Sequence, residues 1–134
     1  MKEDILTILL ITVIVAGLDF IVINNLFLKK WQDVVNSIQG IPLKINYTYT
    51  IITYILVIMG IYIFVYPKLT KDNWFLDGLK WGFLWGIIVY GIFDFTNLSI
   101  FKNYSLDIAI MDTLWGGFLT SATVILTYFI LHKM

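Results

Sequence analysis

The segment ILTILLITVIVAGLDFIVINNLFL, residues 5–28, decides the fold of this chain. It is longer than the roughly 20 apolar residues that a helix needs to cross a hydrocarbon core about 30 Å thick. Its apolar residues lack the period-two alternation of a barrel strand, and a helix pairs its own backbone groups in lipid. Glu3 and Asp4 precede it, so it does not begin like a signal peptide and we expect it in the mature protein. The segment is therefore predicted to be a membrane-spanning helix.

Three further segments have the length and apolar character of spanning helices. They cover residues 47–66, 79–98 and 108–131. The predicted fold class is all-α, a polytopic membrane protein whose four transmembrane helices form an up-down bundle. Because no internal repeat or long linker divides the sequence, residues 1–134 are predicted to form a single transmembrane domain.

The composition agrees with a membrane protein and excludes other classes. The chain is 60% hydrophobic and 13% charged, whereas a soluble domain carries about a quarter charged residues. Its net charge is zero and its basic residues form no stripe, so nucleic acid is excluded as a partner and the lipid bilayer is expected. With no cysteine, a disulfide framework and a thiolate metal site are excluded, and we predict no cofactor.

The region after the first segment has a helical pattern of its own. Trp31, Val34, Val35 and Ile38 recur at helical spacing among polar residues. This pattern predicts a short amphipathic helix lying in the membrane interface. The alternative is an ordinary, partly ordered loop that ends at Gly40 and Pro42.

Four spans place both termini on one side of the membrane, which we call face A; the opposite side is face B. Lysines near face A slightly outnumber those near face B, which gives a small preference for cytoplasmic termini by the positive-inside rule. The two groups are Lys2, Lys68, Lys71, Lys80 and Lys133 near face A, and Lys29, Lys30, Lys44 and Lys102 near face B.

Three carboxylates lie inside the predicted spans: Asp19, Asp94 and Asp112. A charged Asp near the bilayer centre costs at least about 2.5–3.5 kcal/mol. At about 1.5 Å per residue, Asp19 lies about 13 Å from the face-B end of its span, and the other two lie about 6 Å deep. All three therefore fall in the same half of the membrane, where we expect them to point inward as a cluster.

Polar residues on the same helix faces, and on a face of the second span, support this inward orientation. Tyr90 and Asn97 share a helix face with Asp94, and Thr53 and Tyr54 offer polar groups at similar depth in the second span. The candidate binding residues are Asp19, Thr53, Tyr54, Tyr90, Asp94, Asn97, Asp112 and Trp115.

The spans contain no basic residue in the face-B half, so the three carboxylates lack an internal counter-ion. Three close carboxylates cannot all remain ionised in a low-dielectric site. Either some are protonated, or a cation sits among them: a proton, a metal ion of unknown identity, or an organic cation such as a lipid or amine head group. A lysine that reaches inward from the interface, whether Lys29, Lys30, Lys44 or Lys102, would weaken this expectation.

Glycines on two spans predict close helix packing. Gly78, Gly82 and Gly86 form a tandem G-x-x-x-G motif, and Gly116 marks a second crossing on the fourth span. The motif fits packing within one chain, and it also fits a homodimer. Four spans are few for a carrier, so we expect a homo-oligomer.

Three blocks of the sequence resemble a known family: LDF at residues 18–20, YGIFDFTN at 90–97 and DTLWG at 112–116. They are similar to the signature blocks of the domain of unknown function 2177 family, small four-helix membrane proteins found mostly in bacteria. The resemblance covers nearly the whole chain and implies a four-helix membrane fold. The residues that it marks are Asp19, Asp94, Asn97, Asp112, Trp115 and Gly116.

Three functions are compatible with these residues. The first is a binding or transport protein whose carboxylates hold a small cation or lipid ligand, as a channel or carrier built by oligomerisation. The second is a lipid-modifying enzyme with an Asp acid/base pair, although the sequence has no Ser/His/Asp arrangement, His-rich metal site or phosphate loop. The third is a structural or assembly subunit. A cavity open sideways to lipid favours the enzyme, a water-accessible funnel favours transport, and a dry, hydrogen-bonded cluster favours structure.

Overall fold

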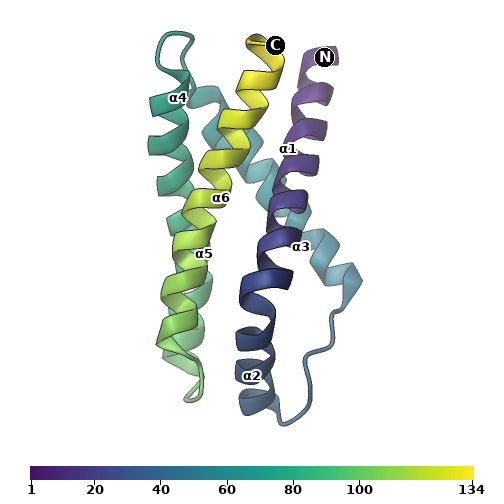
Figure 1. Ribbon diagram of the computed structural model, residues 1–134, viewed down its shortest axis with the longest axis vertical. Helices are drawn as coiled ribbons and strands as arrows, with labels where there is room; N and C mark the ends of the chain where they lie inside the picture. The colour runs from purple at the N-terminus through teal and green to yellow at the C-terminus, as the bar shows by residue number, and fades with distance from the viewer.

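The computed structural model describes residues 1–134 and consists of helices joined by short turns (Figure 1). Four continuous helical segments are long and apolar enough to cross a membrane, so the predicted all-α, four-span fold class is confirmed. Both termini lie at the same end of the bundle, which is face A (Figure 1). The four segments are Lys2–Gln39, Tyr47–Lys68, Trp74–Ile100 and Leu106–His132.

The first segment continues well beyond its apolar run. It comprises α1 (Lys2–Val22), the π-helical turn η1 (Ile23–Phe27) and α2 (Leu28–Gln39). The predicted amphipathic helix is α2, and it extends the axis of α1 toward face B (Figure 1). Gly40 ends α2 in the left-handed region, with φ 71°, as glycine often does after a helix.

The apolar face of α2 is covered by the turn between the last two spans and by the first residues of α6. Val34 is buried there against Tyr104, Ile108 and Ala109. These contacts explain why α2 continues along the bundle, because its apolar stripe is covered by the chain itself.

The second and third segments also contain π-helical or 3-10 turns. The second comprises α3 (Tyr47–Gly60), the π-helical turn η2 (Ile61–Val65) and the 3-10 turn η3 (Tyr66–Lys68). Oδ1 of Asn46 caps the start of α3 by accepting hydrogen bonds from the backbone N–H groups of Thr48 and Tyr49. The third segment comprises α4 (Trp74–Asp77), the π-helical turn η4 (Gly78–Gly82) and α5 (Phe83–Ile100), and the fourth is the single helix α6 (Leu106–His132).

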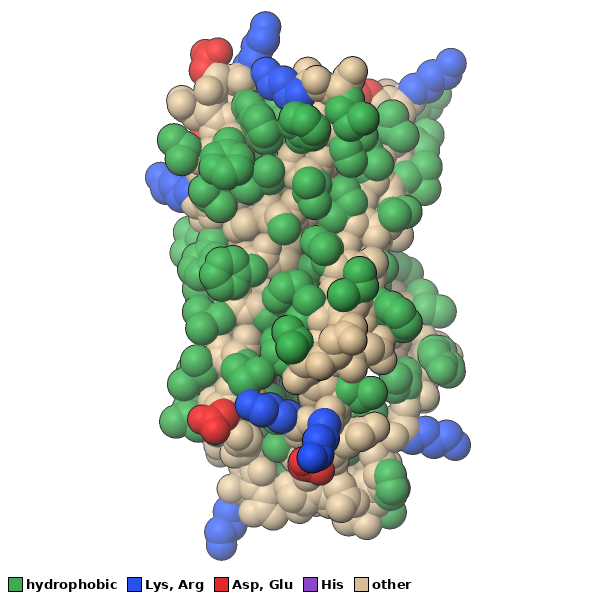
Figure 2. Space-filling model, viewed as in Figure 1, with side chains coloured by type: hydrophobic (Ala, Val, Ile, Leu, Met, Phe, Trp, Pro, Cys, Tyr) green, Lys and Arg blue, Asp and Glu red, His purple; other side chains and the backbone are tan.

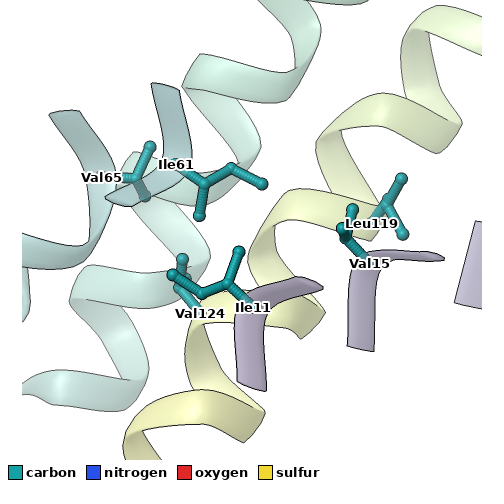
Figure 3. Close-up of a cluster of buried hydrophobic side chains, with 6 residues drawn as sticks. All are labelled: Ile11, Val15, Ile61, Val65, Leu119 and Val124. Carbon is teal, nitrogen blue, oxygen red and sulfur yellow. The ribbon is translucent and has the colours of Figure 1, made fainter. Parts of the chain in front are cut away.

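A hydrophobic core joins three of the segments (Figure 3). It consists of α1, η2 and α6 side chains that are almost fully buried: Ile11, Val15, Ile61, Val65, Leu119 and Val124. Asp19 lies one helical turn beyond Val15 toward face B. The buried carboxylates therefore begin where the hydrophobic core ends.

The glycines of the third segment pack against α6 of the same chain. A Cβ atom on Gly86 would meet the backbone of Gly116, and one on Gly82 would lie 2.7 Å from the Cα of Ser121. A Cβ atom on Gly78 would lie 2.5 Å from Cγ1 of the Ile125 side chain. The tandem motif thus serves an intramolecular crossing, with α5 and α6 in close backbone contact.

The surface has the layout of a membrane-embedded bundle. On the face shown in Figure 2, hydrophobic side chains cover the middle, and lysine and acidic side chains gather toward the two ends. Exposed apolar residues occur along all four segments, among them Val13, Leu56, Ile92 and Phe118. Lipid is the environment that such a surface requires.

Candidate functional site

Asp19 on α1 is held by two neutral donors. Its side chain lies in the bundle, and the residue is only 6% exposed. The hydroxyl of Tyr54 on α3 donates to Oδ2 at 2.5 Å, and Nε1 of Trp115 on α6 donates to Oδ1 at 2.9 Å. Both oxygens therefore have a partner, and the carboxylate joins three spanning segments.

Asp94 on α5 is fully buried and has a second set of neutral donors. The Tyr104 hydroxyl donates to Oδ1 at 2.7 Å, and Oγ1 of Thr113 donates to Oδ2 at 3.3 Å. Burial and the hydrogen bond to Asp94 raise the pKa of Tyr104, which lies in the turn between α5 and α6. Tyr104 therefore stays protonated and remains a donor at neutral pH.

Asp112 on α6 has a different environment. Its carboxyl group lies within hydrogen-bonding reach of the Asp94 carboxyl group, and no hydroxyl, indole or amide group donates a hydrogen bond to it, unlike at Asp19 and Asp94. Its side chain faces a cavity of about 370 Å³. The lining residues are Asp19, Ile23, Trp31, Thr50, Thr53, Tyr54, Val57, Val89, Tyr90, Phe93 and Asp112.

The cavity lies in a wedge between α3 and α5. These helices touch where Gly60 packs against the ring of Trp85, and toward face B they do not pack against each other. Thr53 is exposed and Phe93 is 53% exposed at the rim of the wedge. The cavity is thus open between two spanning helices.

Aromatic rings make up much of the wall. Trp31, Tyr54, Tyr90 and Phe93 line the cavity, and the Trp31 ring lies 6.2 Å from the Phe93 ring and 6.0 Å from the Tyr104 ring. Four aromatic side chains and two carboxyl groups therefore surround one space.

Trp31 is a cavity residue that the sequence pattern did not identify, because its place in the amphipathic segment predicted an interfacial position only. The π turn η1 directly precedes α2, the helix that carries Trp31. π turns occur often at functional sites. No periodicity in the sequence signals this turn.

A second, smaller pocket shares Trp31 and Asp112 with the cavity. It has a volume of about 10 Å³ and is lined by Phe27, Lys30, Trp31, Ile108, Met111 and Asp112, room for about one water molecule. Nζ of Lys30 lies 3.3 Å from Sδ of Met111. Lys30 is exposed and borders this pocket together with Asp112, but no ion pair joins them. The contacts within 4.0 Å between acidic and basic groups are those of the Met1 amino group with Asp4 and of His132 with Glu3.

The remaining candidate residues lie outside the cavity or on its edge. Asn97 is half-buried beside Tyr104, and Oγ1 of Thr53 donates to the backbone oxygen of Tyr49 at 3.0 Å. The Tyr90 ring packs on Gly116. Tyr90 therefore lies in the cavity wall. Asn97 lies outside the cavity, next to Tyr104, the donor to Asp94.

Asp112 has both of the other carboxyl groups as neighbours, Asp94 on α5 and Asp19 on α1. Asp19 lines the same cavity as Asp112 and is held by Tyr54 and Trp115. No group of three or more His, Cys, Asp or Glu side chains is close enough to hold a metal ion. The arrangement can offer one free carboxylate to a ligand, in a field made more negative by two others.

Comparison with known proteins places the chain in a family. No curated protein and no solved structure is significantly similar to it. The model of the family described as predicted membrane protein, domain of unknown function 2177, matches residues 4–129. Together with the four spanning segments, this match makes the chain an integral, multi-pass membrane protein, and the chain belongs to the domain of unknown function 2177 family.

Proposed function

We propose that this protein binds an organic cation in the cavity between α3 and α5, and that Asp112 is the carboxylate that meets the positive charge. One observation carries the proposal. Asp112 faces the cavity and has only another acid, Asp94, as its polar side-chain partner, whereas Asp19 and Asp94 each have both oxygens occupied by hydroxyl or indole donors. Asp112 is therefore the carboxyl group with room to meet a positive charge in the cavity.

An unpaired carboxylate away from bulk water is costly, and a cation in the cavity offsets this cost. The Asp19 and Asp94 carboxylates add negative potential around Asp112, which favours a positive ligand further. A proton also satisfies Asp112, and it then competes with the organic cation for the same group.

The lining favours an organic cation over a metal ion. A hard metal ion takes about six to eight oxygen ligands, whereas no three acidic groups converge here. Aromatic rings attract ammonium groups through their faces, and four rings line this cavity. Its volume of about 370 Å³ falls in the range of small-molecule pockets, about 300–1,000 Å³.

Two features weigh against the other functions considered. The sideways opening of the cavity is of the kind that favours a lipid-modifying enzyme, but an Asp acid/base pair needs two accessible carboxyl groups, and Asp19 and Asp94 each have both oxygens occupied by donors. An oligomeric channel needs contacts between chains, and the glycine motif that fits such contacts packs within the chain. Cation binding by one chain needs neither feature.

The proposal is tested by titrating the detergent-solubilised protein with tetraethylammonium and following tryptophan fluorescence, since Trp31 lines the cavity. We expect saturable binding that Asp112→Asn weakens at least about tenfold, which corresponds to about 1.4 kcal/mol. Asp107→Asn is the matched control, because Asp107 is an exposed acid on the same helix. Equal affinities of wild type and Asp112→Asn would overturn the proposal.

A further inference from the structure

The cavity between α3 and α5 is polar at its inner end. Asp112 faces it from α6, and Tyr90 lines it from α5 in the field of the Asp19 and Asp112 carboxyl groups. The Tyr54 hydroxyl is engaged by Asp19, whereas no side-chain or backbone group is hydrogen-bonded to the Tyr90 hydroxyl. One carboxyl group and one hydroxyl group with spare hydrogen-bonding capacity therefore meet the same space.

The mouth of the cavity is apolar, although two threonines border it. Thr50 and Thr53 each donate their hydroxyl group to the backbone oxygen four residues earlier, at 3.0 Å. Their hydroxyl groups are thus used by the backbone beside them and are not offered to a ligand. Val57 completes the α3 side of the mouth, and Val89 and Phe93 form the α5 side. The cavity therefore changes from polar to apolar between Asp112 and its opening.

The mouth opens to lipid. It lies between two spanning segments, and α3 leans away from the rest of the bundle toward face B (Figure 1). Asp112 lies about 9 Å from the face-B start of α6, at about 1.5 Å per residue from Leu106. Toward face B the Trp31 ring lines the cavity, 6.2 Å from the Phe93 ring of α5. A ligand therefore reaches Asp112 through the side of the bundle, from the face-B leaflet.

Charge restricts the head group of such a ligand. No lysine lines the cavity, so a phosphate group brought in by a phospholipid would have no positive partner, and an unpaired charge away from water is costly. A head group that is only positive meets Asp112 without this cost. If it carries N–H donors, it also satisfies the oxygen atom of the Tyr90 hydroxyl.

We propose that the ligand of the cavity is a long-chain ammonium amphiphile, a lipid amine without a phosphate group. Its N–H groups bind the Asp112 carboxylate and the Tyr90 hydroxyl, and its alkyl chain leaves between α3 and α5 into the face-B leaflet. This inference rests on the proposed function, because it assumes that Asp112 binds an organic cation. It adds the donors of the head group, the chain and the route of entry from the bilayer.

The first test uses the wild-type protein in dodecyl maltoside, a detergent that supplies the same alkyl chain without charge. The probes are dodecylammonium and a lysophosphatidylethanolamine of equal chain length, compared at equal mole fraction in the micelle by isothermal titration calorimetry. We expect dodecylammonium to bind at least about tenfold tighter, because the phosphate group of the other probe has no partner. Equal affinities would overturn the proposal.

The second test concerns the head group. Tyr90→Phe removes the hydroxyl, and we expect it to lower the affinity for dodecylammonium relative to that for dodecyltrimethylammonium by about tenfold, because only the first probe has N–H donors. Tyr49→Phe is the matched control, since Tyr49 is 68% exposed on α3 and does not line the cavity. A ratio that Tyr90→Phe leaves unchanged contradicts the proposed binding mode.

The third test concerns the chain. Thr53→Phe places a larger side chain at the mouth, where Thr53 is exposed, and we expect it to lower the affinity for dodecylammonium relative to that for butylammonium by about tenfold. Leu56→Phe is the control, because Leu56 is 64% exposed on the same helix and lies outside the cavity lining. The same ratio in Thr53→Phe and Leu56→Phe would show that no chain passes this mouth.

The failure of this inference is distinct from that of the proposed function. If any of the three tests fails while Asp112→Asn weakens tetraethylammonium binding, the amphiphile inference is wrong and the proposed function stands. If Asp112→Asn changes the binding of neither tetraethylammonium nor dodecylammonium, both proposals are wrong. The comparison of probes on wild type needs no variant, so a misfolded variant does not remove the test.

Discussion

The hydroxyl group of Tyr54 donates a hydrogen bond of 2.5 Å to Oδ2 of Asp19, and this bond joins the second spanning segment to the first. Trp115 completes the arrangement from α6 by donating to Oδ1 at 2.9 Å. Because α3 and α5 separate toward face B, the Asp19 hydrogen bonds hold α3 beside α1 along the cavity. They define the position of one cavity wall.

Removing the Tyr54 hydroxyl should destabilise the bundle. In Tyr54→Phe, Oδ2 of the buried Asp19 loses its donor, and an unsatisfied buried group costs about 1–3 kcal/mol. The free energy of unfolding in mixed micelles measures the change. Tyr62→Phe is the matched control, because the Tyr62 hydroxyl donates to Asp4, an exposed acid, at 2.9 Å. Equal destabilisation of the two variants would show that the Asp19 hydrogen bond has no special weight.

The close crossing of α5 and α6 predicts the effect of one methyl group. In Gly86→Ala the new Cβ meets the backbone of Gly116, which cannot move aside as a flexible side chain can. Overpacking of this kind costs about 1–3 kcal/mol, measured as a lower unfolding free energy. Gly17→Ala is the control, since nothing lies within 4 Å of its new Cβ.

Gly17→Ala is expected to raise the free energy of unfolding, whereas Gly86→Ala is expected to lower it. Gly17 is exposed on α1, and alanine is more favourable than glycine inside a helix by about 1 kcal/mol. If Gly86→Ala is as stable as Gly17→Ala, the two helices are not in backbone contact at Gly86.

Tyr104 predicts a pH dependence of stability at alkaline pH. Burial, together with the hydrogen bond to Asp94, raises the pKa of Tyr104 above its ordinary value of 10.0. The folded protein therefore holds this proton more tightly than the unfolded chain. The stability from this group is complete below about pH 10 and decreases as pH rises through the higher folded value.

The measurement compares wild type with Tyr104→Phe, so that the other titrating groups cancel. The difference between their unfolding free energies should stay constant from pH 7 to about 10 and then shrink as pH rises, with wild type losing the greater amount. A difference that stays constant up to pH 11 contradicts the buried hydrogen bond to Asp94.

Hydropathy was sufficient to predict the four spans, because lipid imposes length and apolar character on each of them. It did not predict how far the first helix continues. The apolar run ends near Lys29, but helical hydrogen bonding continues to Gln39 because the Val34 face is covered by Tyr104. That cover comes from residues far away in the sequence.

The site was predictable in part for the same reason. Charged side chains inside an apolar segment are conspicuous, so Asp19, Asp94 and Asp112 could be selected from the sequence. Which carboxylate is free could not, because that depends on donors such as Tyr54 and Tyr104 from other parts of the chain. The cavity itself depends on the angle between α3 and α5, which no local pattern encodes.

Thr127 on α6 offers a test of how this bundle treats buried polar atoms. Its Oγ1 is buried without a hydrogen-bond partner, whereas Oγ1 of Thr123, one turn earlier, donates to the backbone oxygen of Leu119 at 2.7 Å. Valine has nearly the shape of threonine and lacks the hydroxyl group, so Thr127→Val should stabilise the fold by about 1–2 kcal/mol. Thr123→Val removes a satisfied hydroxyl and should be neutral or destabilising. The unfolding free energies of both variants are compared with that of wild type, and a loss of stability in Thr127→Val would mean that the buried hydroxyl has a partner within the bundle.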